Sequence, residues 1–165
     1  MRWVPVLVIL VLVFVAGFFT IRVENSKKRR LTWIVLIYLA CLSGILFTPI
    51  SFDGSSIYIM PAGIGRVNLT RLYLHGLGFM ENIILTIPLG MIVKKLIPQI
   101  PLVVVGILGV VTGALIESLQ FYMSNHWLIN RSSDINDVIA NAIGIFVGGL
   151  IIVGYQYFQN EKNLQ

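Results

Sequence analysis

Five apolar segments, each long enough to cross a lipid bilayer, place the strongest limit on how this chain can fold. They lie at about residues 3–21, 31–50, 79–97, 102–121 and 134–156. A helix needs about 20 apolar residues to cross the hydrocarbon core, and it satisfies its backbone hydrogen bonds internally. The segments therefore predict an all-α integral membrane protein with five transmembrane helices.

The composition agrees with this fold class. Of the 165 residues, 57% are hydrophobic and 12% are charged, whereas a soluble domain carries about a quarter charged residues. We expect a single membrane domain, residues 1–165, in the plasma (cytoplasmic) membrane as a multi-pass protein. The formal net charge of +5 lies mainly in the segments between the spans, so it predicts membrane topology and no nucleic-acid partner.

Five spans place the two ends of the chain on opposite sides of the membrane. The connections and the tail on one side hold eight Lys and Arg residues, and those on the other side hold four. The side with more basic residues is usually the cytoplasmic one. We therefore expect the N-terminus outside and the C-terminus in the cytoplasm.

Four of the seven acidic residues lie at span ends that this topology assigns to the outer side: Glu81, Glu117, Asp134 and Asp137. An ionisable group at the centre of a membrane helix costs about 2.5–3.5 kcal/mol, so such groups face the bundle interior or a water-filled cavity. Asp134, Asp137 and Asn141 fall at i, i+3 and i+7, on one face of the fifth helix. The pattern predicts an outward-facing polar pocket.

The candidate site residues follow from this pattern. Glu117, Asp134 and Asp137 are the candidate catalytic residues, because carboxylates act as acids, bases or cation ligands. The candidate binding residues are amides and a guanidinium, with Arg131 one turn before Asp134 as a counter-charge: Asn82, Gln120, Arg131 and Asn141.

Structural explanations compete with these roles. Asp134 fits a helix N-cap, and Asp137 would then lie in the first turn, where the helix dipole favours an anion. The amides fit hydrogen bonds between helices. Glu117 lies about one turn, or roughly 6 Å, from the predicted end of its helix. The dipole disfavours an anion there, which favours a functional role.

Three motifs resemble the VanZ-like family of bacterial membrane proteins. They are ENIILTIPLGMIV at 81–93, IESLQ at 116–120 and RSSDINDVIANAIGIFVG at 131–148. The resemblance covers about residues 67–150. Many relatives carry N-L-x-P-F before these motifs, and this chain keeps Asn68-Leu69 but lacks the Pro-Phe. The name-giving member is associated with resistance to teicoplanin, a lipophilic glycopeptide antibiotic, so the resemblance implies a role in the cell envelope.

Three mechanisms stay open on the sequence. The pocket binds a lipid headgroup, a lipid-linked wall precursor or the antibiotic. Alternatively, the chain is an enzyme acting on a lipid-linked substrate, with its carboxylates holding Mg²⁺ or one of them transferring protons. A transporter is the third reading, but the polar groups gather on one side only. The two histidines lie too far apart in the sequence to indicate a zinc site.

Overall fold

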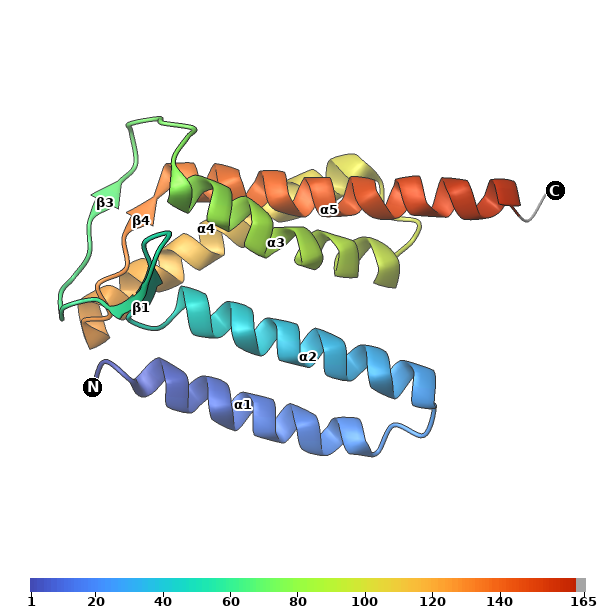
Figure 1. Cartoon of the computed structure of the whole chain (residues 1–165), viewed down its shortest axis with the longest axis horizontal. Helices are drawn as coiled ribbons and strands as arrows, with labels where there is room; N and C mark the ends of the chain where they lie inside the picture. The colour runs from blue at the N-terminus through green and yellow to red at the C-terminus, as the bar shows by residue number, and fades with distance from the viewer. Residues whose placement is uncertain (163–165) are drawn as a thin grey trace. The chain divides into compact units, whose positions relative to one another are not determined.

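The computed structural model describes residues 1–162. This part of the chain contains five long helices (Figure 1). These are α1 (Val4–Ile21), α2 (Ser26–Leu46), α3 (Leu77–Leu96), α4 (Leu102–Trp127) and α5 (Ile135–Lys162). All five are long and apolar enough to cross a membrane. The prediction of five helices long and apolar enough to span a membrane is confirmed, and the orientation of the termini stays a prediction.

Three helix boundaries lie beyond the predicted ones because polar residues continue the helices past the apolar segments, whereas α2 ends at Leu46, before the predicted end at residue 50. α2 begins at Ser26, where the Asn25 side chain accepts a hydrogen bond from the Lys28 N–H at 3.0 Å and so acts as the N-cap. α4 continues to Trp127, and the next residue, Leu128, has a φ of +53° that ends it. α5 continues to Lys162.

The chain divides into two compact units. The first comprises Met1–Val67 and Leu119–Ser133, and the second comprises Asn68–Ser118 and the chain from Asp134 onward. The first unit therefore contains α1, α2 and the end of α4. The second contains α3, most of α4 and α5. The prediction of one membrane domain stays a prediction.

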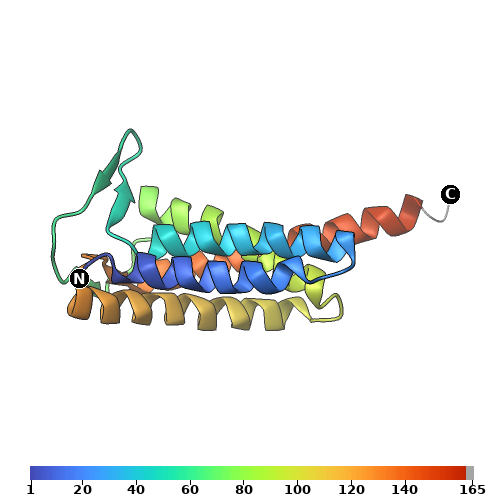
Figure 2. The ribbon, with the colours of Figure 1, turned by 90° about the horizontal axis from the view of Figure 1, so that it is seen from below.

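In the first unit, α1 and α2 lie side by side as an antiparallel pair (Figures 1 and 2). The connection after α2 forms a small hairpin of two antiparallel strands, β1 (Ile50–Phe52) and β2 (Ile57–Ile59). The sequence predicts no helix or strand between the apolar segments at 31–50 and 79–97. The β-branched and aromatic residues of β2, after a turn that contains Gly54, favour the hairpin instead. Two shorter strands, β3 (Val67–Asn68) and β4 (Ser133–Asp134), also pair.

In the second unit, glycines bring the backbones of α3 and α5 into direct contact, and Figure 1 shows the two helices side by side. A Cβ at Gly148 would lie 2.0 Å from the Ile87 carbonyl oxygen, and one at Gly144 would lie 2.3 Å from that of Ile83. On α4, a Cβ at Gly113 would lie 2.7 Å from the Val138 carbonyl oxygen. Such small residues let membrane helices approach closely.

We predict that Gly148→Ala destabilises the protein by about 1–3 kcal/mol, because the added methyl group forces α3 and α5 apart. Gly154→Ala in the same helix is the matched control, since no atom lies within 4 Å of its added Cβ. The melting temperature of the detergent-solubilised protein measures both effects. Equal melting temperatures for the two variants would contradict the close contact.

Candidate functional site

The Asp134 side chain caps the start of α5. Its Oδ1 accepts hydrogen bonds from the Asn136 N–H at 2.9 Å, the Asn136 amide at 2.6 Å and the Asn68 amide at 2.9 Å. The Tyr73 hydroxyl donates to Oδ2. The N-cap role that the sequence left open is therefore present in the structure. Both oxygens of this carboxylate, which is only 6% exposed, already have partners.

These hydrogen bonds decide the charge of Asp134. Burial by itself raises the pKa of the carboxyl group, but the hydrogen bonds from Tyr73, Asn136 and Asn68 outweigh it, and the pKa lies below its ordinary value. The pKa of the Tyr73 hydroxyl is raised, chiefly because it donates to this carboxylate. At neutral pH the pair therefore consists of an ionised aspartate and a neutral tyrosine.

The same network ties the segment before α3 to the start of α5. The Asn136 side chain accepts from the Tyr73 N–H at 2.8 Å and donates to the Arg71 carbonyl at 2.9 Å. The Asn68 side chain accepts from the Arg71 N–H at 2.9 Å. Sequence reasoning assigned no role to Asn68, Tyr73 or Asn136. Two signals could have indicated such a role from the sequence: the position of Asn136 in the first turn after Asp134, and the Asn68-Leu69 pair kept from the family motif.

The Glu117 side chain accepts a hydrogen bond from the backbone of Asp134, the residue that caps α5. Its Oε2 accepts from the Asp134 N–H at 2.8 Å, and its side chain is 5% exposed. The expectation that Glu117 lies one turn from the end of its helix was wrong, because α4 continues to Trp127. The carboxylate lies instead at the N-terminus of α5, where the helix dipole favours an anion.

Asn141 lies further along α5 and is 1% exposed. Its backbone carbonyl accepts from the Thr86 hydroxyl at 3.2 Å, and the same hydroxyl donates to the Asn82 carbonyl at 2.7 Å. Within residues 1–162, neither the nitrogen nor the oxygen of the Asn141 amide has a hydrogen-bond partner. A buried polar group left unsatisfied costs about 1–3 kcal/mol. Asp137, one turn nearer the helix start, is half-buried.

In the first unit, two predicted binding residues hold the end of α2. The Arg131 guanidinium donates to the carbonyls of Ile45 and Ile50, and to that of Thr48 at 3.0 Å. The Gln120 amide donates to the Leu46 carbonyl at 3.0 Å. The last carbonyls of a helix have no partner within it, and a cation near them is favourable. Both side chains therefore stabilise the C-terminus of this helix.

The structure also bears on the metal alternative. Within the described part of the chain, no three His, Cys, Asp or Glu side chains are grouped as ligands for one ion. His75 and His126 are both exposed, and the His126 ring stacks on Tyr122 with their centroids 4.0 Å apart. A Mg²⁺ ion at the carboxylates would therefore take part of its coordination from a substrate or from water.

Five helices long and apolar enough to cross a membrane, in a strongly apolar chain, indicate a multi-pass helical membrane protein. The sequence pattern of one family, described as VanZ/LLP1, matches residues 3–156. The chain belongs to the VanZ/LLP1 family. The match extends beyond residues 67–150, where the motifs of the resemblance lie. No curated protein and no solved structure matches the chain.

We predict that Tyr73→Phe lowers the free energy of unfolding by about 1 kcal/mol at neutral pH. This loss of free energy is smaller than that for a fully buried hydrogen bond to a charged group, because the Tyr73 ring is partly exposed. The pKa of Tyr73 is raised in the folded protein above its ordinary value of 10.0. Its contribution is therefore fully present below pH 10 and is lost as the pH rises through the folded pKa.

Chemical denaturation of the parent and the variant between pH 7 and about pH 11 measures this difference, since other tyrosines and lysines cancel in the comparison. The two curves should converge at the alkaline end. A difference that stays constant with pH would show that the Tyr73 hydroxyl contributes nothing through Asp134.

Proposed function

We propose that this VanZ/LLP1 protein binds the polar headgroup of a membrane amphiphile through Glu117, Asp137 and Asn141, with Asp134 as the structural anchor. The observation that carries the proposal is the Asn141 amide, which is buried without a hydrogen-bond partner among the described residues. A ligand group that satisfies this amide recovers the free energy lost by burying it unpaired. Asp134 already serves as the N-cap of α5. Arg131 and Gln120 already donate to carbonyls at the end of α2.

The chemistry of these side chains favours one class of headgroup. The Asn141 amide both donates and accepts, and the nearby carboxylates on α4 and α5 accept. Hydroxyl, amide and ammonium groups match that set. Such groups occur in amino-lipid headgroups, in the sugar and peptide parts of lipid-linked wall precursors, and in teicoplanin-type glycopeptides. The Asn82 backbone carbonyl accepts from the Thr86 hydroxyl within α3, and this bond assigns no role to the Asn82 side chain. The proposed role is therefore in the cell envelope, with protection against a lipophilic glycopeptide as its outcome.

The proposal assigns these residues to the outer half of the cytoplasmic membrane, because basic residues are twice as numerous on the opposite side. We predict that a reporter active only in the cytoplasm is active when fused to the C-terminus and inactive when fused before α1. The reverse pattern would place these residues on the cytoplasmic side and would contradict access from outside. It would not contradict the five-helix fold.

We predict that a teicoplanin-susceptible host expressing this chain tolerates more antibiotic, and that Glu117→Gln, Asp137→Asn and Asn141→Leu each remove the protection. Losing one charge-assisted hydrogen bond of about 1.5–3 kcal/mol weakens binding roughly tenfold or more. Glu117→Gln keeps an oxygen that accepts from the Asp134 N–H. Asn141→Leu replaces an unpaired amide with an apolar side chain of similar shape, so it should fold at least as well as the parent.

Glu161→Gln is the control, because Glu161 is an exposed acidic residue in the last turns of α5. All variants are compared at equal abundance in the membrane. Protection by the parent and Glu161→Gln alone supports the proposal. A host that gains no tolerance from the parent chain contradicts the antibiotic function for this protein. Full protection by Asn141→Leu contradicts the assigned site.

An enzyme acting on a lipid-linked substrate is the second candidate, and the burial of Glu117 favours it. A carboxylate that is 5% exposed on a membrane helix is a candidate general acid or base. Turnover of lipid-linked wall precursor by the purified protein, lost in Glu117→Gln, would distinguish this candidate from a binder. Sensitivity of that turnover to a chelator would indicate Mg²⁺.

A further inference from the structure

The β1–β2 hairpin in the first unit has one face made entirely of large apolar side chains. Ile50 pairs with Ile59 and Phe52 pairs with Ile57, and the pair between them is Ser51 with Tyr58. Residues directly opposite each other in an antiparallel pair point to the same face, and the face alternates along the strand. The four apolar residues therefore share one face, with Ser51 and Tyr58 on the other.

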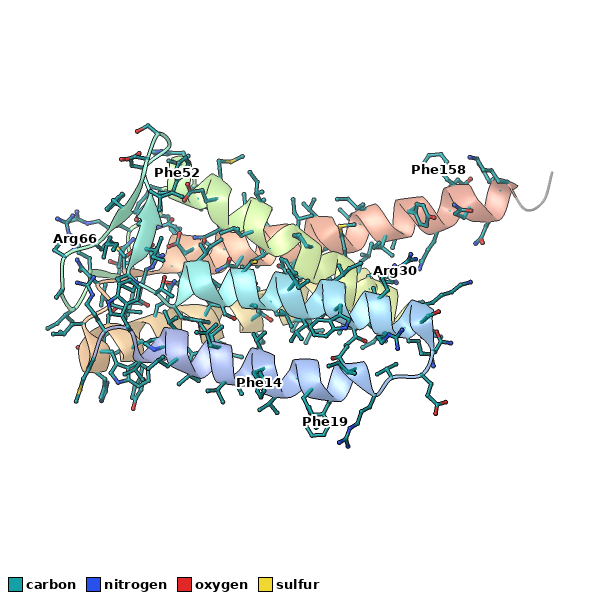
Figure 3. The ribbon with its side chains drawn as sticks, turned by 60° about the horizontal axis from the view of Figure 1, so that its bottom comes forward. Phe14, Phe19, Arg30, Phe52, Arg66 and Phe158 are labelled. Atoms are coloured by element: carbon teal, nitrogen blue, oxygen red, sulfur yellow. The ribbon has the colours of Figure 1, made fainter. Side chains whose placement is uncertain are left out.

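This apolar face has little cover from the protein. The exposed fraction is 40% for Ile50, 47% for Phe52, 76% for Ile57 and 60% for Ile59. Figure 3 labels Phe52 in the hairpin, at the opposite end of α2 from Arg30. A two-stranded hairpin is marginally stable in water by itself, and contiguous exposed apolar surface marks an interaction site.

The turn of the hairpin is polar. The Asp53 carboxylate accepts from the N–H groups of Ser55 and Ser56, both at 2.8 Å, and from both serine hydroxyls. The hydrogen bond from the Ser56 N–H is the largest of the effects that lower the pKa of Asp53 far below its ordinary range. The tip of the hairpin is therefore charged at all physiological pH values and suits water or lipid headgroups.

Both ends of the hairpin are tied to membrane-spanning helices. α2 ends at Leu46 and β1 begins at Ile50, and four residues of extended chain reach at most about 14 Å. After β2, the Met60 carbonyl accepts from the Arg2 guanidinium, and Arg2 lies just before α1. The hairpin therefore cannot move far from the surface of the bilayer that these helices cross. Tyr58 is of the aromatic type that is enriched at this boundary.

We infer that the apolar face of the β1–β2 hairpin binds the phospholipid bilayer, with Ile50, Phe52, Ile57 and Ile59 in the boundary between headgroups and acyl chains. The polar turn at Asp53 lies among the headgroups, and Tyr58 points away from the acyl chains. The hairpin thereby acts as an interfacial anchor for the first unit. This inference does not rest on the proposed headgroup site, and it holds for either orientation of the chain.

The test places an environment-sensitive fluorophore on single cysteines in the full chain. Ile57→Cys, Tyr58→Cys and Ile59→Cys are made in a Cys41→Ser background, because Cys41 is an exposed free cysteine. The labelled proteins are reconstituted in phosphatidylcholine–phosphatidylglycerol vesicles, with a nitroxide on the acyl chain or with aqueous iodide as the quencher. We expect nitroxide lipid to quench the label at Ile57→Cys and Ile59→Cys, and iodide to quench it at Tyr58→Cys.

Two other results would overturn the inference. Iodide quenching at all three positions would place the hairpin in water. Shielding of positions 57 and 59 from both quenchers would show that protein, such as a second copy of the chain, covers the face.

A second pair of variants tests whether the fluorophore itself, and not the apolar face, brings the hairpin into contact with lipid. Adding Ile57→Glu to the Ile59→Cys protein should abolish its nitroxide quenching, because a carboxylate resists insertion among acyl chains. Adding Ser55→Glu in the exposed turn should leave the quenching unchanged. Equal effects of the two glutamates would contradict binding through the apolar face.

Discussion

Backbone contact between α3 and α5 is the constraint on which the candidate site depends. Lipid is as apolar as leucine, so membrane helices gain little by burying apolar side chains and associate through close packing instead. Gly144 and Gly148 let the carbonyls of α3 approach the α5 backbone. The contact places Thr86 against the Asn141 carbonyl. The Asn141 side chain is thereby buried between helices without a partner among the described residues.

Most polar residues of the predicted site complete the hydrogen bonding of helix ends. Asp134 caps α5, Glu117 accepts from the Asp134 N–H, and Arg131 and Gln120 donate to carbonyls at the end of α2. Backbone groups without partners are costly where water is scarce, so these contacts have a structural explanation. Asn141 differs from them because burial isolates its side-chain amide. The functional proposal rests mainly on that difference.

The individual site residues were less predictable than the helices. The i, i+3 and i+7 spacing singled out Asp134, Asp137 and Asn141, and the capping pattern before α5 indicated the structural role of Asp134. Tyr73 carried no such signal and Asn68 carried only that of the family motif, because both contact Asp134 across more than sixty residues of chain. The environment of Glu117 was predicted wrongly because polar residues after 121 continue the helix, although no apolar periodicity marks them.

The sequence by itself determined that the described chain forms five helices of membrane-spanning length. The reason is physical: bilayer thickness sets the length of a span, and a helix satisfies its own backbone within one segment. Only the tertiary structure decided which carboxylate has which partner, which amide has none, and that four apolar side chains share one face of the hairpin. These features depend on helix contact distances and strand register, which join segments that local sequence patterns do not connect.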